Sequence, residues 1–63
     1  MLNLNYKAGS IIKYRAFDGE VRKVVVEDRE ADVKNGRPGF VGTTTSGEDV
    51  WGYDYQIIEV IKR

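Results

Sequence analysis

Three large aromatic side chains, Trp51, Tyr53 and Tyr55, occupy every second position near the end of this 63-residue chain. Alternate residues of a β-strand point to the same face of a sheet, so one strand through all three would place the rings in a row. Such a row forms either a wall of the hydrophobic core or a surface that recognises a partner. We expect a surface that binds a protein partner at these three residues.

Gly52 leaves two places open for the Trp51 ring, the core and the surface. A glycine inside a strand often marks a bulge or the close approach of another backbone. A kink there would divide Trp51 and Tyr53 between surface and core. Tyr55 follows Asp54, where the strand is expected to end, so Tyr55 should face solvent.

Four further residues belong to the same prediction. We assign Arg37 and Phe40 to the partner-binding surface, with Arg37 on a preformed turn as a polar anchor at its rim. Tyr14 or Phe17 could enlarge the surface with further ring area of the kind that dominates binding hot spots.

Catalysis is not expected from this composition. The chain has no His to act as a base near neutral pH and no Cys to act as a nucleophile. Ser10 and Ser46 lie in predicted turns without a paired base. Asp49 and Asp54 flank the aromatic strand, but a catalytic pair would need one carboxyl buried with a raised pKa, and so short a chain has little interior. We therefore predict no enzyme, no cofactor, no metal site and no small-molecule substrate.

The ten basic and ten acidic residues cancel, which argues against a general coat for nucleic acid. A nucleic-acid-binding domain is nevertheless the alternative function. Aromatic rings can stack on bases while neighbouring basic side chains hold phosphates, as in barrels that bind single strands. The basic residues assigned to this alternative are Lys13, Arg15, Arg22 and Lys23.

The charges are also segregated along the chain. Residues 1–26 hold five basic against two acidic residues, and residues 27–54 hold seven acidic against three basic residues. A dipolar molecule can orient a partner or a second copy of itself. Small domains often gain stability from disulfides or self-association, and the absence of Cys leaves self-association open.

The elements that position these residues are predicted to be short strands. Residues 11–17 are rich in β-branched and aromatic side chains, and Asp18-Gly19 is a strong two-residue hairpin signal before a second branched run, 21–26. In such a turn Phe17 would face Glu20. Ile12, Tyr14, Ala16, Val21 and Val25 would then form the core wall.

Residues 27–34 lose the alternation and are predicted as a loop. Two turn signals follow, Asn35-Gly36 and Pro38-Gly39, the second suited to a type II turn. The remaining elements are expected to be strands at residues 40–45, 50–53 and 57–61, with a turn at Ser46-Gly47 and a tight bend at 54–56. Residues 1–8 should form either a loose arm or an additional edge strand.

Five short strands joined by tight turns predict a single all-β domain over residues 1–63, a small five-stranded SH3-like barrel. A single 3₁₀ turn before the last strand is common in that fold. The stretch from Val50 to Ile61 resembles the closing segment of plasmid-encoded, trimethoprim-resistant dihydrofolate reductases, which are SH3-like barrels. Trp51-Gly52 replaces the Gln-Ile pair of their pore motif, so the resemblance implies the fold without the reductase site.

A second resemblance covers more of the chain. The segments KNGRPGF, from Lys34 to Phe40, and VWGYDYQI, from Val50 to Ile57, resemble short uncharacterised proteins of bacteriophages and related mobile elements. That resemblance implies a phage or prophage accessory protein. No apolar run approaches the roughly 20 residues of a membrane span. We therefore expect a cytoplasmic protein of the bacterial host with no membrane partner.

Overall fold

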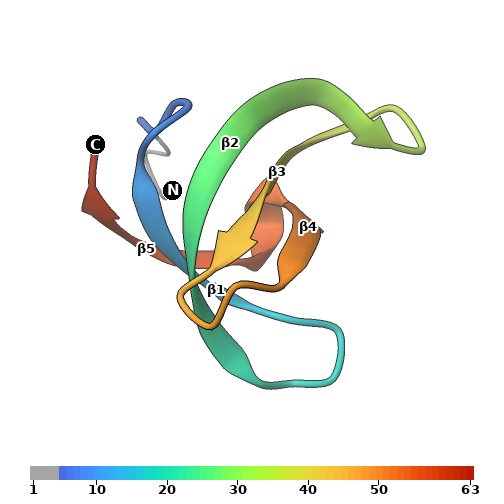
Figure 1. Cartoon of the computed structure of the whole chain (residues 1–63). Coiled ribbons are helices and arrows are strands. Elements are labelled where there is room, and N and C mark those ends of the chain that lie inside the picture. The colour runs from blue at the N-terminus through green and yellow to red at the C-terminus, as the bar shows by residue number, and fades with distance from the viewer. Residues whose placement is uncertain (1–4) are drawn as a thin grey trace.

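The protein is an all-β domain of five antiparallel strands, described by a computed structural model over residues 5–63. The strands form one open sheet in the order β4-β3-β2-β1-β5 (Figure 1). Their bounds are β1 Ile11–Arg15, β2 Val21–Lys34, β3 Arg37–Thr44, β4 Asp49–Tyr53 and β5 Ile57–Lys62, and a 3₁₀ turn, η1 Asp54–Gln56, joins the last two. None of the helical segments in the described part of the chain is long and apolar enough to cross a membrane.

Strand β2 is the longest element and holds the two halves of the sheet together. Its first half pairs with β1 and its second half with β3. The strand curves strongly along its length, as Figure 1 shows. A register shift between Val26 and Asp28 leaves Glu27 as an extra residue, and such bulges increase the bend and twist of a strand.

The core fills the inside of this curve. Ile12 and Tyr14 from β1 pack with Val24 and Val26 from β2, and the Phe40 ring lies edge-on to Tyr14 at 5.2 Å between centroids. Gly42 allows β3 to pass close to β2. A Cβ atom at this position would collide with the carbonyl oxygen of Val25 and would lie 2.7 Å from Cγ1 of Val24.

The first hairpin forms where it is predicted, but its register differs by one residue. Arg15 pairs with Val21, and the turn is the three-residue loop Phe17-Asp18-Gly19, closed by the Ala16 N–H bonding the Glu20 carbonyl at 2.8 Å. Gly19 takes the left-handed conformation with φ of 88°, as this loop type requires. A shift of one residue in the pairing moves each β2 side chain to the opposite face of the sheet. Val21 and Val25 are therefore exposed and do not form the predicted core wall.

The prediction of a loop at residues 27–34 is wrong, because this segment continues β2. The backbone hydrogen bonds of this half of β2 are made with β3. The strand therefore forms although its side chains are mostly polar and exposed and show no clear alternation. Asn35 and Gly36, with φ of 58° and 73°, form the two-residue turn at its end. Pro38-Gly39 is not a turn but part of β3, and the β2–β3 register is interrupted opposite Pro38, which has no N–H to donate.

The second half of the chain confirms the predicted order of strand, turn, strand, bend and strand. The Gln56 side chain fastens η1 in place. Its Oε1 accepts from the Tyr53 N–H at 2.8 Å, and its Nε2 donates to the Arg15 carbonyl at 2.9 Å.

The N-terminal segment is anchored where the structure describes it. A loose arm or an edge strand was predicted for residues 1–8. Residues 1–4 of that segment lie outside the described residues. Tyr6 is buried against Phe40, and its hydroxyl donates to the Asp54 carboxylate. Arg29 completes this contact, because its guanidinium lies 4.2 Å from the Tyr6 ring centroid and pairs with Asp54 at 3.2 Å.

Candidate partner-binding surface

The aromatic row lies on the outer face of the β2–β3–β4 half of the sheet. Trp51 is directly opposite Val41, and Tyr53 is directly opposite Gly39. Cross-strand partners share a face, and Phe40 is opposite Gly52 on the other, core-facing side. A Cβ atom at Gly52 would lie 2.8 Å from the Phe40 ring. Gly52 is therefore a site of close approach, and the predicted kink that divides the two rings is wrong. Trp51 and Tyr53 share one face, and neither belongs to the core cluster.

Four rings from three elements form one cluster, which we call the aromatic surface. Phe17 comes from the β1–β2 loop, Trp51 and Tyr53 from β4, and Tyr55 from η1. Trp51 lies 5.4 Å from Tyr53 and 5.5 Å from Phe17 between ring centroids, while Tyr53 and Tyr55 stack at 5.2 Å with an interplanar angle of 15°. Tyr53 is buried among the other rings, whereas Phe17 and Tyr55 remain 65% and 68% exposed.

The tip of the β2–β3 hairpin folds over one end of the aromatic surface. The Lys34 ammonium lies 5.3 Å from the Trp51 ring centroid, and the Asn35 amide donates to the Tyr53 hydroxyl at 3.3 Å. An ammonium over an indole face is stabilised by the negative charge of the π-system. The hairpin tip thus helps to fix the orientation of the two β4 rings.

Two open grooves of about 360 Å³ each lie on either side of Phe17. The first runs between the β1–β2 loop and β4, where Phe17 and Trp51 meet the carboxylates of Asp18 and Asp49 and the guanidinium of Arg22. The second is more apolar and runs beside η1, with Tyr55 and Ile58 in its lining. Phe17 is therefore a ridge between an acidic aromatic groove and an apolar one.

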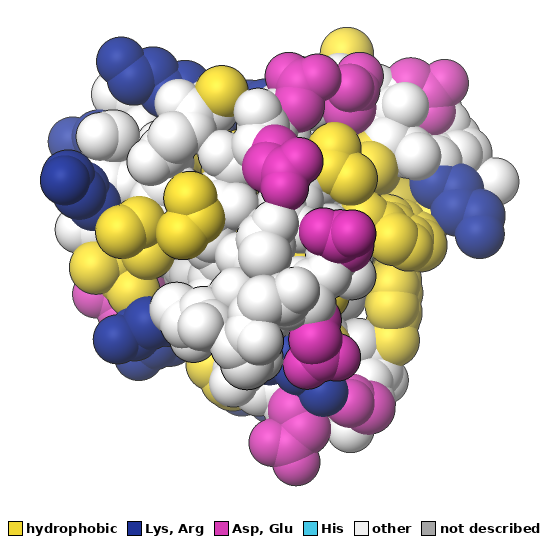
Figure 2. All heavy atoms as spheres, in the orientation of Figure 1, with side chains coloured by type: hydrophobic (Ala, Val, Ile, Leu, Met, Phe, Trp, Pro, Cys, Tyr) yellow, Lys and Arg dark blue, Asp and Glu magenta, His cyan; other side chains and the backbone are white. Residues whose placement is uncertain are grey.

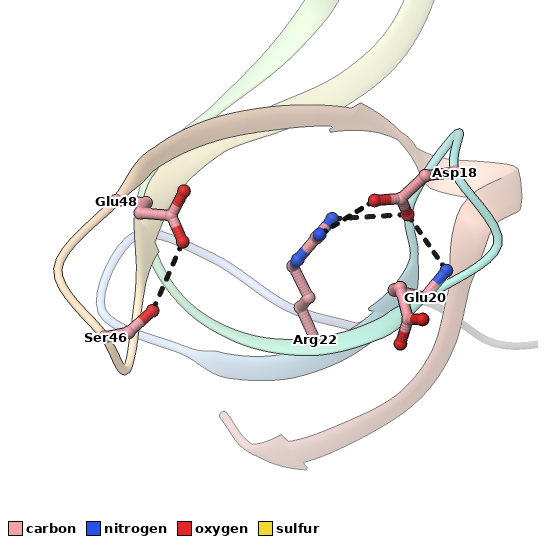
Figure 3. A network of polar contacts seen from close by, with 5 residues as sticks. All are labelled: Asp18, Glu20, Arg22, Ser46 and Glu48. Carbon is pink, nitrogen blue, oxygen red and sulfur yellow. Dashed lines mark hydrogen bonds and ion pairs between the residues drawn. The ribbon is translucent and has the colours of Figure 1, made fainter.

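The β1–β2 loop that carries Phe17 is held by a local polar network (Figure 3). Asp18 accepts from the Glu20 N–H at 2.9 Å and from the Arg22 guanidinium at 2.8 Å. These two donors keep the pKa of the Asp18 carboxyl below its usual range. In the adjacent β3–β4 turn, Ser46 donates to Glu48 at 3.5 Å. Because Arg22 neutralises Asp18, Asp49 is the carboxylate of the first groove left to meet a cation.

The structure brings together Trp51, Tyr53 and Tyr55, as predicted. Phe40 is a correction, because it is fully buried in the core on the opposite side of the sheet and cannot touch a partner. Alternation along β3 explains this, since Phe40 and Val41 must point to opposite faces. Arg37 is exposed at the start of β3, opposite Lys34, and it is the Lys34 ammonium that lies over Trp51.

Phe17 has a larger role in the aromatic surface than predicted, and Lys34 and Asn35 were not among the predicted site residues. The Asn35-Gly36 turn signal could have located the latter two, because a two-residue turn makes Lys34 and Arg37 direct neighbours. The role of Phe17 depends on the three-residue loop, which the Asp18-Gly19 pair alone did not indicate.

The four residues of the nucleic-acid alternative do not share one surface. Lys13, Arg15 and Lys23 point outward from β1 and β2, with Lys13 directly opposite Lys23. Arg22 is opposite the buried Tyr14 on the other side of the sheet and is paired with Asp18. Arg22 is thus occupied within the fold, and three basic residues remain for that function.

Comparison with known proteins found no matching family model, no matching curated protein and no matching solved structure.

Proposed function

We propose that this chain is a non-enzymatic binding module that holds a segment of a protein partner across Phe17. The observation that carries this proposal is the placement of Phe17 and Tyr55. They are the most exposed large hydrophobic side chains in the described part of the chain, and both belong to one ring cluster bordered by grooves. Exposed aromatic groups gathered at a groove are typical of interaction sites.

The two grooves suggest the chemistry of the partner segment. A Lys or Arg side chain would fit the first groove, where an indole face and the Asp49 carboxylate lie together. An aliphatic side chain would fit the second, beside Tyr55 and Ile58. Because the grooves flank Phe17, the partner segment would be extended, with its basic and aliphatic residues on either side of that ring.

We assign the fold to the SH3-like barrels on three features. The strand order β5-β1-β2-β3-β4, the long curved β2 shared by both halves, and the 3₁₀ turn before the last strand all support this assignment. The resemblance of the KNGRPGF and VWGYDYQI segments to phage proteins supports a phage or prophage accessory protein acting in the host cytoplasm.

Nucleic-acid binding is the weaker proposal. It rests on Lys13, Arg15 and Lys23, and Glu59 lies 3.9 Å from the Lys13 ammonium. Arg15 lines the second groove beside Tyr55, whereas Lys13 and Lys23 line neither groove, so only one of the three phosphate contacts would lie next to the exposed rings.

Selection of a random peptide display library on the immobilised protein tests the proposed function. We expect enriched peptides that combine a basic with an aliphatic residue and that bind at least tenfold more weakly to Phe17→Ser, since truncating a hot-spot side chain costs about 2 kcal/mol or more. Val25→Ser is the matched control, because Val25 is also exposed but lies on the outer face of the first hairpin. Equal binding to wild type and Phe17→Ser would overturn the proposal.

A further inference from the structure

Two rows of like charge lie on the outer surface of the two halves of β2. The first, which we call the basic row, is formed by Lys13, Arg15 and Lys23. Lys13 and Lys23 are direct cross-strand partners, an arrangement that destabilises an isolated sheet. Glu59 is the ion-pair partner of Lys13 among the described residues. The row therefore keeps a net positive charge.

The second row, which we call the acidic row, is formed by Asp28 and Glu30 beyond the bulge of β2. Asp28 is opposite Val41, and Glu30 is opposite Gly39. Val41 and Gly39 are two residues apart on β3, so both carboxylates lie on one face. Hydrogen bonding to Asp28 and the charge of Asp28 raise the pKa of the Glu30 carboxyl. In Figure 2 acidic side chains run from the top through the centre to the bottom of the molecule, and most basic side chains lie on the left.

We propose that the chain associates head to tail, with the basic row of one copy docked against the acidic row of a second copy. Each row is electrostatically unfavourable within one chain, and each would neutralise the other across an interface. Exposed aliphatic side chains lie beside both rows, Val21 and Val25 beside the basic row and Val41 beside the acidic row. These side chains would supply the apolar contact that an interface needs.

The positions of the rows determine the kind of assembly. They lie on different halves of β2, so a copy that uses its basic row still has its acidic row free. Such a contact is heterologous and generates a chain or a ring of copies. The contact depends on exposed charges and should weaken with salt, because the screening length is about 10 Å at 0.1 M and about 3 Å at 1 M ionic strength. The proposal does not rest on the binding of a partner at Phe17.

Sedimentation velocity of wild type, Lys23→Glu and Glu30→Lys tests this contact. At an ionic strength of about 0.01 M we expect the wild type to sediment faster as its concentration rises, and to return to the monomer near 1 M. Each variant alone should remain a monomer. Each should also be at least as stable as wild type to urea, because each removes a repulsion within the chain. A loss of stability would show that the residue serves the fold alone and would overturn the proposal.

An equimolar mixture of the two variants is the decisive sample. Glu30→Lys retains the basic row and Lys23→Glu retains the acidic row, so one contact can form and the mixture should stop at a heterodimer. The pair Lys7→Glu and Glu48→Lys provides matched changes of net charge at exposed residues that belong to neither row, and each of these variants should associate as wild type does.

Three results would overturn the proposal: a wild type that is monomeric throughout, a mixture that contains no heterodimer, or control variants that behave like the row variants. Binding of labelled single-stranded DNA at low salt that is lost in Lys23→Glu, without association of the wild type, would instead assign the basic row to nucleic acid.

Discussion

Tyr6 shows how a single residue couples the N-terminal segment to the rest of the fold. Its hydroxyl donates to Asp54, and burial together with this hydrogen bond raises the pKa of the phenol well above its usual value. A group with a raised pKa in the folded state contributes stability below its unfolded pKa, which is about 10, and loses it as the pH rises further. Ionisation of Tyr6 should therefore destabilise the protein in alkali.

Comparison of wild type with Tyr6→Phe measures this contribution. We expect Tyr6→Phe to lower the free energy of unfolding near pH 7 by about 1 kcal/mol, the usual value of one hydrogen bond. The difference should shrink above pH 10 as the wild type loses stability. Urea unfolding at pH 7 and at several values above pH 9 provides the measurement. A constant difference across the series would contradict the assignment.

Trp51 and Phe40 are predicted to respond oppositely to truncation. Phe40 is fully buried, so Phe40→Ala should cost about 3–5 kcal/mol and leave a chain of this size largely unfolded. Trp51 lies on the outer face, so Trp51→Ala should remain folded while losing peptide binding. Circular dichroism and thermal unfolding of both variants check this. Unfolding of Trp51→Ala would show that its ring is needed by the fold.

Trp51 and Phe40 also show which part of the site could be predicted from the sequence. Period-two spacing correctly placed Trp51 and Tyr53 on one strand. The position of Phe40 was wrong because two turn signals, Asn35-Gly36 and Pro38-Gly39, suggested a loop between them. Only the pairing of β2 with β3 shows that the strand begins at Arg37, which makes Phe40 face inward.

At the scale of elements, the close pairing of β2 and β3 depends on Gly42. A Cβ atom there would meet the Val25 backbone and the Val24 side chain, which are both parts of a paired strand. Overpacking of a tightly packed site typically costs about 1–3 kcal/mol, and backbone gives way less readily than side chains. Gly42→Ala should therefore destabilise the sheet by about 3 kcal/mol or more.

Gly47→Ala is the matched control for this substitution. Gly47 has φ of 92° in the β3–β4 turn, and its Cβ position is open. Its replacement should cost about 1 kcal/mol, through backbone conformation alone. The urea midpoints of the two variants give the comparison, and a smaller effect at Gly42 than at Gly47 would contradict the packing argument.

The elements were easier to predict than their registers. Branched runs and turn residues located β1, β4 and β5 to within two residues at each end. The length of β2 was missed because its second half has exposed polar side chains on a strand stabilised by pairing with β3, and alternation is then a weak signal. The hairpin register depended on a loop of three residues instead of two, a difference that the Asp-Gly signal does not resolve.

At the scale of the whole molecule, the fold places the aromatic surface beside the two charged rows. The acidic row shares a face with Trp51 and Tyr53, on the other side of Val41 and Gly39. Arg15 of the basic row lines the second groove. Net charge gave no hint of this arrangement, because the ten basic and ten acidic residues cancel. The separation of basic and acidic residues along the sequence did indicate it. The first half of β2 lies in the basic row and the second half in the acidic row.

Amide NMR spectra of the ¹⁵N-labelled wild type, titrated with one selected peptide, test the central claim most directly. Partner binding across Phe17 predicts shifts concentrated at Phe17, Asp49, Tyr55 and the Trp51 indole N–H, with little change at Lys23 and Val25. Shifts concentrated on the basic row, or spread evenly over the sheet, would contradict it.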